Sequence, residues 1–334
     1  MTFKGALGAA IGSLFLGSLP AGQAFAADHE ITLAATVTTS TAMYRSAEAF
    51  KEAVERRSDG RVAVELAFDG VFGGDRDVVE LLQLGEVQMM WGTDIAYSIV
   101  IESLGFPNLP YLFPTYEAVD EHYFGGFIGD AYKDILLRNG IRHLGWGEND
   151  YRHITTSRVA VTEVEDLSGL KLRVPQFPSL LSFFLKLGAN PTPMAFTEIY
   201  TALQQKTIDG QDNGPILTAS SRFYEVQDHF TSTSHVYSGA ALTINEEFFE
   251  DLPADIQAII AEEGEKAAAM QLRENRADVS AATERMKQAG IQFHELSPEA
   301  RGRFLVVAKE VWQEFADQYD PELMARIQSE FGNF

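Results

Sequence analysis

Apolar residues alternate with polar ones in short runs near the start of the chain and then recur at helical spacing. The run Glu30–Ala35 alternates as a half-buried strand does, and Val62–Ala67 repeats the pattern. Between these runs, four apolar residues recur at i, i+4, i+7 and i+11, which predicts one face of a helix that ends at Gly60. In chain order the pattern predicts strand 30–35, helix 43–54, strand 62–67, helix 75–83 and strand 87–91. Such an alternation is typical of a parallel sheet flanked by helices, so we expect an α/β fold.

A second series of strands and helices follows a loop at 106–114 that is rich in proline and aromatic residues. We expect the later elements to be a helical region at 117–139 broken at Gly125-Gly126, strands 141–146, 170–174, 208–211 and 240–245, and helices 178–187, 197–205, 216–222 and 255–289, with a final helix capped by Ser297 and Pro298. The sequence contains no internal repeat and no Gly/Ser-rich linker. Two α/β lobes would therefore be joined by crossing strands and the long helix rather than by a flexible tether.

The N-terminal segment has the composition of an export signal. Lys4 is its only charge, an apolar run follows, and Ala24-Phe25-Ala26 provides an A-x-A cleavage site. A retained membrane anchor is the alternative, but glycine, serine and proline interrupt a run that is already short for a bilayer. We therefore expect residues 1–26 to be a signal peptide cleaved after Ala26.

The overall charge restricts the partners of the chain. The 334 residues carry a formal net charge of −22 and contain no cysteine. An acidic surface repels nucleic acid and anionic lipid, and the absence of cysteine excludes disulfides and a thiol nucleophile. If such a protein binds an anion, it must do so in a local cationic pocket, which directs attention to individual arginines.

Three blocks place an arginine, an aromatic ring and a side-chain amide at successive strand-to-helix corners. The blocks are Leu170–Pro175, Gly188–Tyr200 and Asp209–Asn213. A guanidinium presents a planar fork of donors that matches the two oxygens of a carboxylate. In order and spacing these blocks resemble those of the periplasmic solute-binding proteins of TRAP (tripartite ATP-independent periplasmic) transporters, the C4-dicarboxylate-binding family. The resemblance extends over essentially the whole mature chain.

The resemblance assigns roles to three polar residues. Arg173 matches the arginine that pairs with the ligand carboxylate, and a surface salt bridge is the alternative. Arg152 would address the same carboxylate, unless it forms an ion pair with Glu148 or Asp150. Asn213 would recognise a polar ligand group, although the family usually has proline directly after this asparagine, where this chain has Gly214.

Six further residues are candidates for the walls of the cleft. Phe196 matches a family ring that packs on the carbon skeleton of the ligand, although an ordinary core position is the alternative. Residues after the first strand and at the start of the helix at 75 could serve the distal polar end of the ligand, and two aromatic residues of adjacent loops could line the cleft. The six candidates are Phe196, Thr36, Asp75, Arg76, Trp146 and Phe177.

No sequence motif supports catalysis or a cofactor. The seven histidines form no zinc motif, and there is no nucleophile elbow, phosphate-binding loop or dinucleotide fingerprint. The segment from Asp209 faintly resembles a calcium loop, but its twelfth position, Ser220, offers no carboxylate. We expect no enzyme activity, no catalytic residue, no cofactor and no metal, with a secreted hydrolase as the remote alternative.

The resemblance implies a two-lobe (Venus-flytrap) receptor with the chain crossing between the lobes and a long helix spanning both. Lobe I would comprise residues 27–149 and 238–277, and lobe II residues 150–237 and 278–334. The expected function is to bind a small carboxylate, a sugar acid or hydroxy acid, in the periplasm and deliver it to integral membrane TRAP permease subunits. A C4-dicarboxylate or a 2-oxo acid is the alternative ligand. We expect a monomer and no nucleic-acid partner.

Overall fold

The computed structural model describes residues 1–2 and 27–332, so the expected signal peptide falls almost entirely outside the described residues. Within residues 27–332, nine strands form one mixed sheet in the order β2-β1-β3-β8-β4-β7-β5-β6, with β9 paired to β8. The strands are β1 (His29–Ala34), β2 (Val62–Ala67), β3 (Met89–Thr93), β4 (Ile141–Thr156), β5 (Lys171–Val174), β6 (Asn190–Pro193), β7 (Gly210–Asn213), β8 (His229–Asn245) and β9 (Gln292–Glu295).

Two long antiparallel strands join two parallel sets. β1 pairs in parallel with β2 and β3, and β5 pairs in parallel with β6 and β7. Between the sets, β4 and β8 pair with each other along almost their full length, with register shifts at Glu148/Asp150 and Arg152/Ile154. We call the set β1–β3 with its helices the first half and the set β5–β7 with its helices the second half. Two of the expected lobe boundaries, 149/150 and 237/238, lie within β4 and β8, and the third, 277/278, lies within the long helix at Ala254–Gln288; they remain predictions.

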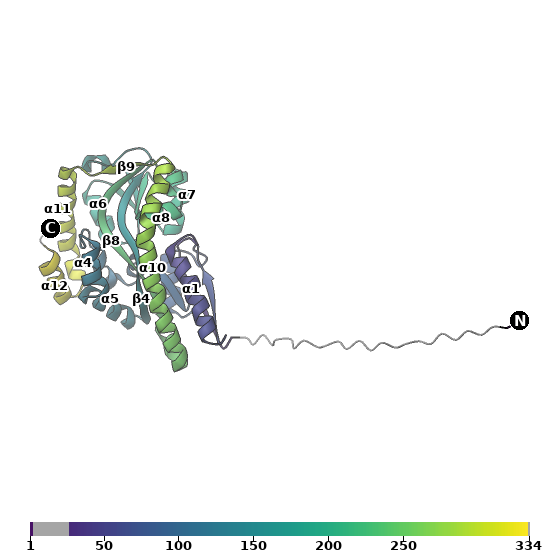
Figure 1. Ribbon diagram of the computed structural model, residues 1–334. Helices are drawn as coiled ribbons and strands as arrows, with labels where there is room; N and C mark the ends of the chain where they lie inside the picture. Colours follow the sequence, from purple (N-terminus) through teal and green to yellow (C-terminus); the bar gives the residue numbers. More distant parts are fainter. Residues whose placement is uncertain (3–26, 333–334) are drawn as a thin grey trace.

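The helices cover both faces of the sheet (Figure 1). They are α1 (Ala42–Arg57), α2 (Asp75–Gln83), α3 (Asp94–Ser98), α4 (Tyr116–Ala118), α5 (Phe127–Arg138), α6 (Pro178–Lys186), α7 (Ile199–Gln204), α8 (Pro215–Ser220), α9 (Glu246–Asp251), α10 (Ala254–Gln288), α11 (Pro298–Phe315) and α12 (Pro321–Phe331). The 35-residue helix α10 runs along both halves and packs against α1, β4 and α8. The two-lobe α/β architecture is thereby confirmed. None of the described helices is both long and apolar enough to span a bilayer.

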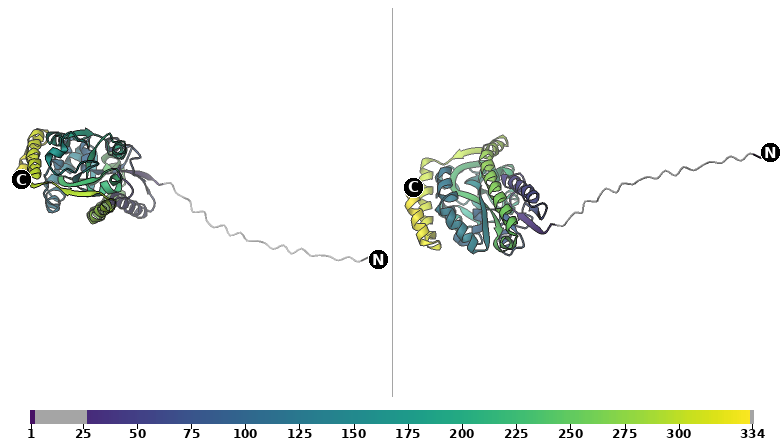
Figure 2. Two further views of the ribbon diagram at one scale, coloured as in Figure 1. Left: turned by 90° about the horizontal axis from the view of Figure 1, so that it is seen from above. Right: turned by 60° about the horizontal axis from the view of Figure 1, so that its bottom comes forward.

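The apolar core is not divided evenly between the halves. One buried cluster gathers β1, β2 and the start of α10 around Phe50 and Trp91, whereas a larger cluster extends from α2 to the C-terminal helices. Figure 2 shows α11 and α12 at the end of the molecule far from α1. They contact both halves, since α11 packs on α6 while Phe331 of α12 lies against Phe113.

The differences from the expected elements concern polar segments. The strands predicted at 141–146 and 240–245 are apolar ends of the much longer β4 and β8, whose remaining residues are polar and nevertheless mostly buried. The helical region at 117–139 is three pieces, because a π-helix at Val119–Phe124 and the glycines after it interrupt the α-helical pattern. β6, β9, α3, α9 and α12 were not predicted.

Candidate functional site

A cavity of about 30 Å³ lies where the two parallel sets of strands point toward each other. Carboxyl ends of parallel strands are the usual ligand sites of α/β sheets, and here such ends come from both halves. β5 and β7 supply Arg173 and Asn213, while the segments after β1 and β3 supply Thr36 and Ile95. The full lining is Thr36, Val37, Asp75, Thr93, Ile95, Asn149, Arg152, Arg173, Pro175, Phe196, Asn213 and Leu217.

Arg173 lies in the cavity wall without an acidic partner. Its side chain is only 3% exposed, and its Nε and Nη2 atoms donate to the carbonyl oxygen of Met194 at 2.9 and 2.7 Å. Among the described residues, no carboxylate lies within salt-bridge distance of this guanidinium. Burial lowers the pKa of Arg173 to about 10, so it remains charged at neutral pH. A buried cation that donates to one carbonyl oxygen can still take an anionic ligand as its ion-pair partner.

Arg152 lines the same cavity but is already paired. Its Nε donates to Oδ2 of Asp212 at 2.7 Å, and both side chains are almost fully buried. Glu148 and Asp150, the partners considered from the sequence, are not bonded to it. Burial alone would raise the pKa of Asp212, but Arg152 and His235 together hold it below its ordinary value. The pair fixes the orientation of Arg152, and it reduces the charge that Arg152 offers to a ligand.

A buried amide network orients Asn213. Its Nδ2 donates to Oε1 of Gln211 at 2.6 Å, and Gln211 in turn donates to Oγ1 of Thr155 at 2.8 Å. Gly214 follows, where the family pattern has proline. A Cβ at this position would lie 3.1 Å from the carbonyl oxygen of Tyr151, so glycine allows the close approach of β4. The departure from the family pattern therefore leaves Asn213 in the cavity wall.

The opposite wall is polar and acidic. Oγ1 of Thr36 donates to Oδ1 of the half-buried Asp75 at 2.7 Å, which directs one carboxylate oxygen. Burial raises the pKa of Asp75, against the opposing effects of Thr36 and Arg173. Asp75 is the only acidic residue among those that line the cavity. This wall therefore presents acceptors where the other presents cations.

Phe196 bridges the two halves. It packs against the first-half cluster and also against the second-half cluster around Ile199 and Phe223. The two halves also approach closely at Gly70. A Cβ on this glycine would lie 2.7 Å from the Thr197 side chain. The described conformation thus has the first-half loop at Gly70 closed against the second half.

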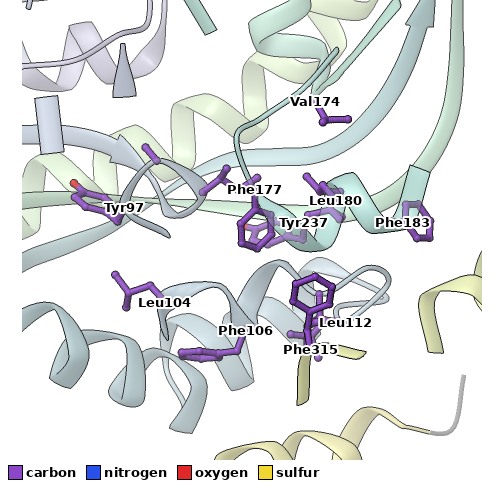
Figure 3. Close-up of a cluster of buried hydrophobic side chains, with 14 of the residues drawn as sticks. Tyr97, Leu104, Phe106, Leu112, Val174, Phe177, Leu180, Phe183, Tyr237 and Phe315 are labelled. Atoms are coloured by element: carbon purple, nitrogen blue, oxygen red, sulfur yellow. The ribbon is translucent and has the colours of Figure 1, made fainter. Parts of the chain in front are cut away.

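Three of the residues proposed from the sequence do not line this cavity. Arg76 donates from Nη2 to the carbonyl oxygen of Ile99, directly after α3, at 3.0 Å. It lines a neighbouring hollow that Asp75, Arg173 and Phe196 also line. Trp146 packs among aromatic rings that include Tyr123. Phe177 is buried in the large apolar cluster (Figure 3). The structure therefore brings together Arg173, Arg152, Asn213, Phe196, Thr36 and Asp75.

Six lining residues were not selected from the sequence, namely Val37, Thr93, Ile95, Asn149, Pro175 and Leu217, and neither was Asp212 behind the wall. Asn149 and Asp212 take part in polar contacts of the site. Asn149 is 2% exposed, lines the cavity and donates to Oγ of Ser238 at 3.3 Å. Asp212 organises Arg152. Each lies next to a residue that was selected or considered, and strand alternation alone does not tell which neighbour faces a cleft when the strand contains bulges.

The fold and site define a two-lobe periplasmic binding protein. The model of the bacterial extracellular solute-binding proteins, family 7, matches residues 33–318. The chain is 31% identical over 329 residues to a C4-dicarboxylate-binding periplasmic protein, DctP, of Rhodobacter capsulatus, covering 97% of each chain.

Solved structures agree with this match. The sugar acid binding protein DctPAm of Advenella mimigardefordensis strain DPN7T, in complex with galactonate, is 28% identical with a TM-score of 0.85, over 90% of this chain and 96% of that one. A TRAP periplasmic solute-binding protein of Shewanella oneidensis with bound succinate is 29% identical with a TM-score of 0.84, over 90% and 98%. This chain belongs to family 7 of the bacterial extracellular solute-binding proteins, the TRAP receptors. The family consists of transport receptors rather than enzymes.

Proposed function

We propose that this protein is a periplasmic TRAP receptor that captures a small hydroxylated monocarboxylate, such as a sugar acid, in the cavity between its halves. The observation that carries the proposal is the buried, unpaired guanidinium of Arg173 in the cavity wall. A ligand carboxylate would complete its ion pair, with Arg152 and Asn213 beside it and Phe196 covering the carbon chain. Charge-assisted bonds of this kind are strong in a closed cleft.

The composition of the opposite wall supports a hydroxylated ligand. Asp75 and Thr36 suit the hydroxyl groups of a sugar acid, which can donate to the carboxylate. The distal carboxylate of a C4-dicarboxylate would instead face Asp75. Arg76, the first-half cation considered for that role, is already bonded to the carbonyl oxygen of Ile99 and lies 3.7 Å from Glu80. A C4-dicarboxylate remains the second candidate because of the Rhodobacter and Shewanella relatives, and a 2-oxo acid would fit the same cationic wall.

The proposed receptor would act as an exported monomer. Its signal peptide would be cleaved after Ala26, and lobes with the boundaries given above would close on the acid. The closed form would dock on the integral membrane subunits of a TRAP permease. No cofactor, metal or catalytic residue is part of this proposal.

A thermal-shift screen tests the ligand class. The screen would contain galactonate, succinate, pyruvate and neutral galactose. We expect galactonate to raise the melting temperature most, because it carries both a carboxylate and hydroxyl groups. A ligand at 100 times its Kd adds about 2.7 kcal/mol of stability. Stabilisation by galactose but by none of the acids would contradict the carboxylate assignment. Turnover of a bound acid would instead favour the hydrolase alternative.

A further inference from the structure

The segment of β4 that crosses between the halves, residues 148–150, has two sides with different partners. Asn149 lies in the cavity wall and is bonded to Ser238 of β8. Its neighbours Glu148 and Asp150 are buried as well, yet neither lines the cavity. They belong to a cluster with side chains from α10 and from the first half.

An arginine of the long helix binds one of these acids. Arg276 of α10 donates from Nε to Oε2 of Glu148 at 3.0 Å, and its Nη1 and Nη2 donate to Asp120 at 2.9 and 2.7 Å. Tyr237 donates to the same Glu148 carboxylate at 2.6 Å. One guanidinium thus ties the crossing strand, the long helix and the π-helix of the first half together.

The backbone of the crossing segment is held by the same helix. Gln271 of α10 accepts from the backbone N–H of Glu148 and donates to its carbonyl oxygen, both at 2.8 Å. The pairing of β4 with β8 has a register shift at Glu148/Asp150, and the Gln271 side chain supplies hydrogen bonds to the backbone of Glu148 there. Helix and strand are therefore joined at the point where the chain passes from one half to the other.

The second acid stabilises an unusual backbone conformation. Asp150 has φ +97°, a left-handed value that costs a residue with a Cβ on the order of 1 kcal/mol or more. Its Oδ1 accepts from the Tyr116 hydroxyl at 2.5 Å and from the Tyr151 N–H at 2.6 Å. The Tyr116 ring lies 5.3 Å from that of Tyr151 and 4.8 Å from the Arg276 guanidinium, so both acids share one cluster.

We propose that Glu148, Asp150, Tyr116, Tyr237 and Arg276 form a hinge latch that favours the closed arrangement and positions Asn149 in the ligand cavity. Within residues 27–332, the crossing segment belongs to one of the two strands, β4 and β8, through which the sheet passes between the halves, so its torsion angles influence their relative orientation. The latch holds those angles while the loop at Gly70 is closed against Thr197. It acts on affinity without touching the ligand, because apparent affinity scales with the fraction of receptor in the binding-competent state.

This inference rests on the proposed function only in that closure captures a ligand, so its test includes a readout that needs none. Because the chain has no cysteine, the double variant Leu84→Cys/Gln204→Cys would react with a thiol-specific label at these two positions, one on each half. Both positions are exposed. Label-to-label distance distributions of the ligand-free protein would be compared for the wild type and for latch variants.

The variants differ in severity so that a folding defect does not hide the result. Arg276→Gln removes the guanidinium, the double variant Glu148→Gln/Arg276→Gln avoids an unpaired buried acid, and Tyr116→Phe removes one hydroxyl. Arg57→Gln is the matched control, because Arg57 also pairs with a buried acid of α10, Glu263, but within the first half.

The latch variants should show broader and longer label distances than the wild type, and Arg57→Gln should not. With galactonate as the probe, Kd should rise about tenfold for Arg276→Gln and about threefold for Tyr116→Phe, mainly through faster dissociation. Unchanged distances in the latch variants would overturn the latch, even if Kd rose. If galactonate does not bind the wild type, the proposed ligand class fails while the distance measurement still decides on the latch.

Discussion

The two walls of the cavity differ in charge and in how they are supported. The second-half wall carries Arg173 and Arg152, both about 97% buried, and Asp212 fixes the latter. The first-half wall carries Thr36 and a half-buried Asp75, joined by one hydrogen bond. One wall is a preorganised cation site, whereas the other is a small set of acceptors.

In the proposed binding mode, this difference would separate the capture of an acid from the choice among acids. The cost of burying two guanidiniums is met within the fold for Arg152 but not for Arg173, so a carboxylate gains most at Arg173. In the proposed binding mode, the first-half wall would contribute less binding energy, but it would face the part of the ligand that varies between acids. Substitutions on the two walls should therefore change different quantities.

The largest effect on stability is expected for Asp212, the buried carboxylate that pairs with Arg152 of the cationic wall. Asp212→Asn should lower the free energy of unfolding by about 3–5 kcal/mol, because it leaves the buried Arg152 without a countercharge. Urea unfolding of the ligand-free protein measures this. Asp255→Asn removes an exposed ion pair with Arg61 and should leave the midpoint nearly unchanged. If both variants unfold at the same urea concentration, the pair does not support the wall.

Arg173→Met should instead act on binding. We expect it to weaken galactonate binding by about 2–5 kcal/mol, since one partner of a desolvated charge pair is lost. The free energy of unfolding should not fall as it does in Asp212→Asn, because Arg173 bonds only the carbonyl oxygen of Met194. Calorimetric titration measures the affinity, and Arg173→Lys, which keeps the charge but not the fork, should lie between the wild type and Arg173→Met. Retained affinity in Arg173→Met would place the carboxylate elsewhere.

The strand that carries Arg152 should also make the fold sensitive to acid. His153, the residue after Arg152, has its pKa lowered to about 3 by burial, with His235 and Arg301 acting in the same direction. The unfolded chain therefore binds a proton below about pH 6.5 that the folded chain does not, and stability falls as pH drops from there toward 3. At pH 5 the loss from this residue should be about 1–2 kcal/mol.

Unfolding curves at pH 7 and pH 5 measure this loss. His153→Gln keeps an acceptor for the Ser234 N–H, which His153 Nδ1 accepts at 3.2 Å. The variant should lose less stability on acidification than the wild type does. An equal loss in both proteins would show that His153 is not the group responsible.

The same contrast explains what could be predicted from the sequence. The apolar strands β1 and β2 and the long helix were expected almost to the residue, because their periodicity reports burial in an apolar core. The polar parts of β4 and β8 were not expected, since their buried residues satisfy one another by hydrogen bonds rather than by apolar contact. Arg173, Arg152 and Asn213 were found through family blocks, whereas Asn149 and Asp212 depend on pairings between distant strands that no local pattern reports.

The smallest effect is expected on the acidic wall, where it should change the preference between ligands rather than overall affinity. Asp75→Asn keeps the size of the side chain but replaces a charged acceptor by a neutral one, so galactonate should lose about 1 kcal/mol. Succinate should gain, since its distal carboxylate would no longer face a negative charge. Titrations of both acids measure the ratio of their Kd values, and Glu80→Gln on the exposed side of the same helix is the control. If Asp75→Asn weakened both acids equally, Asp75 would support the cavity without selecting its ligand, and the two walls would not divide capture from choice.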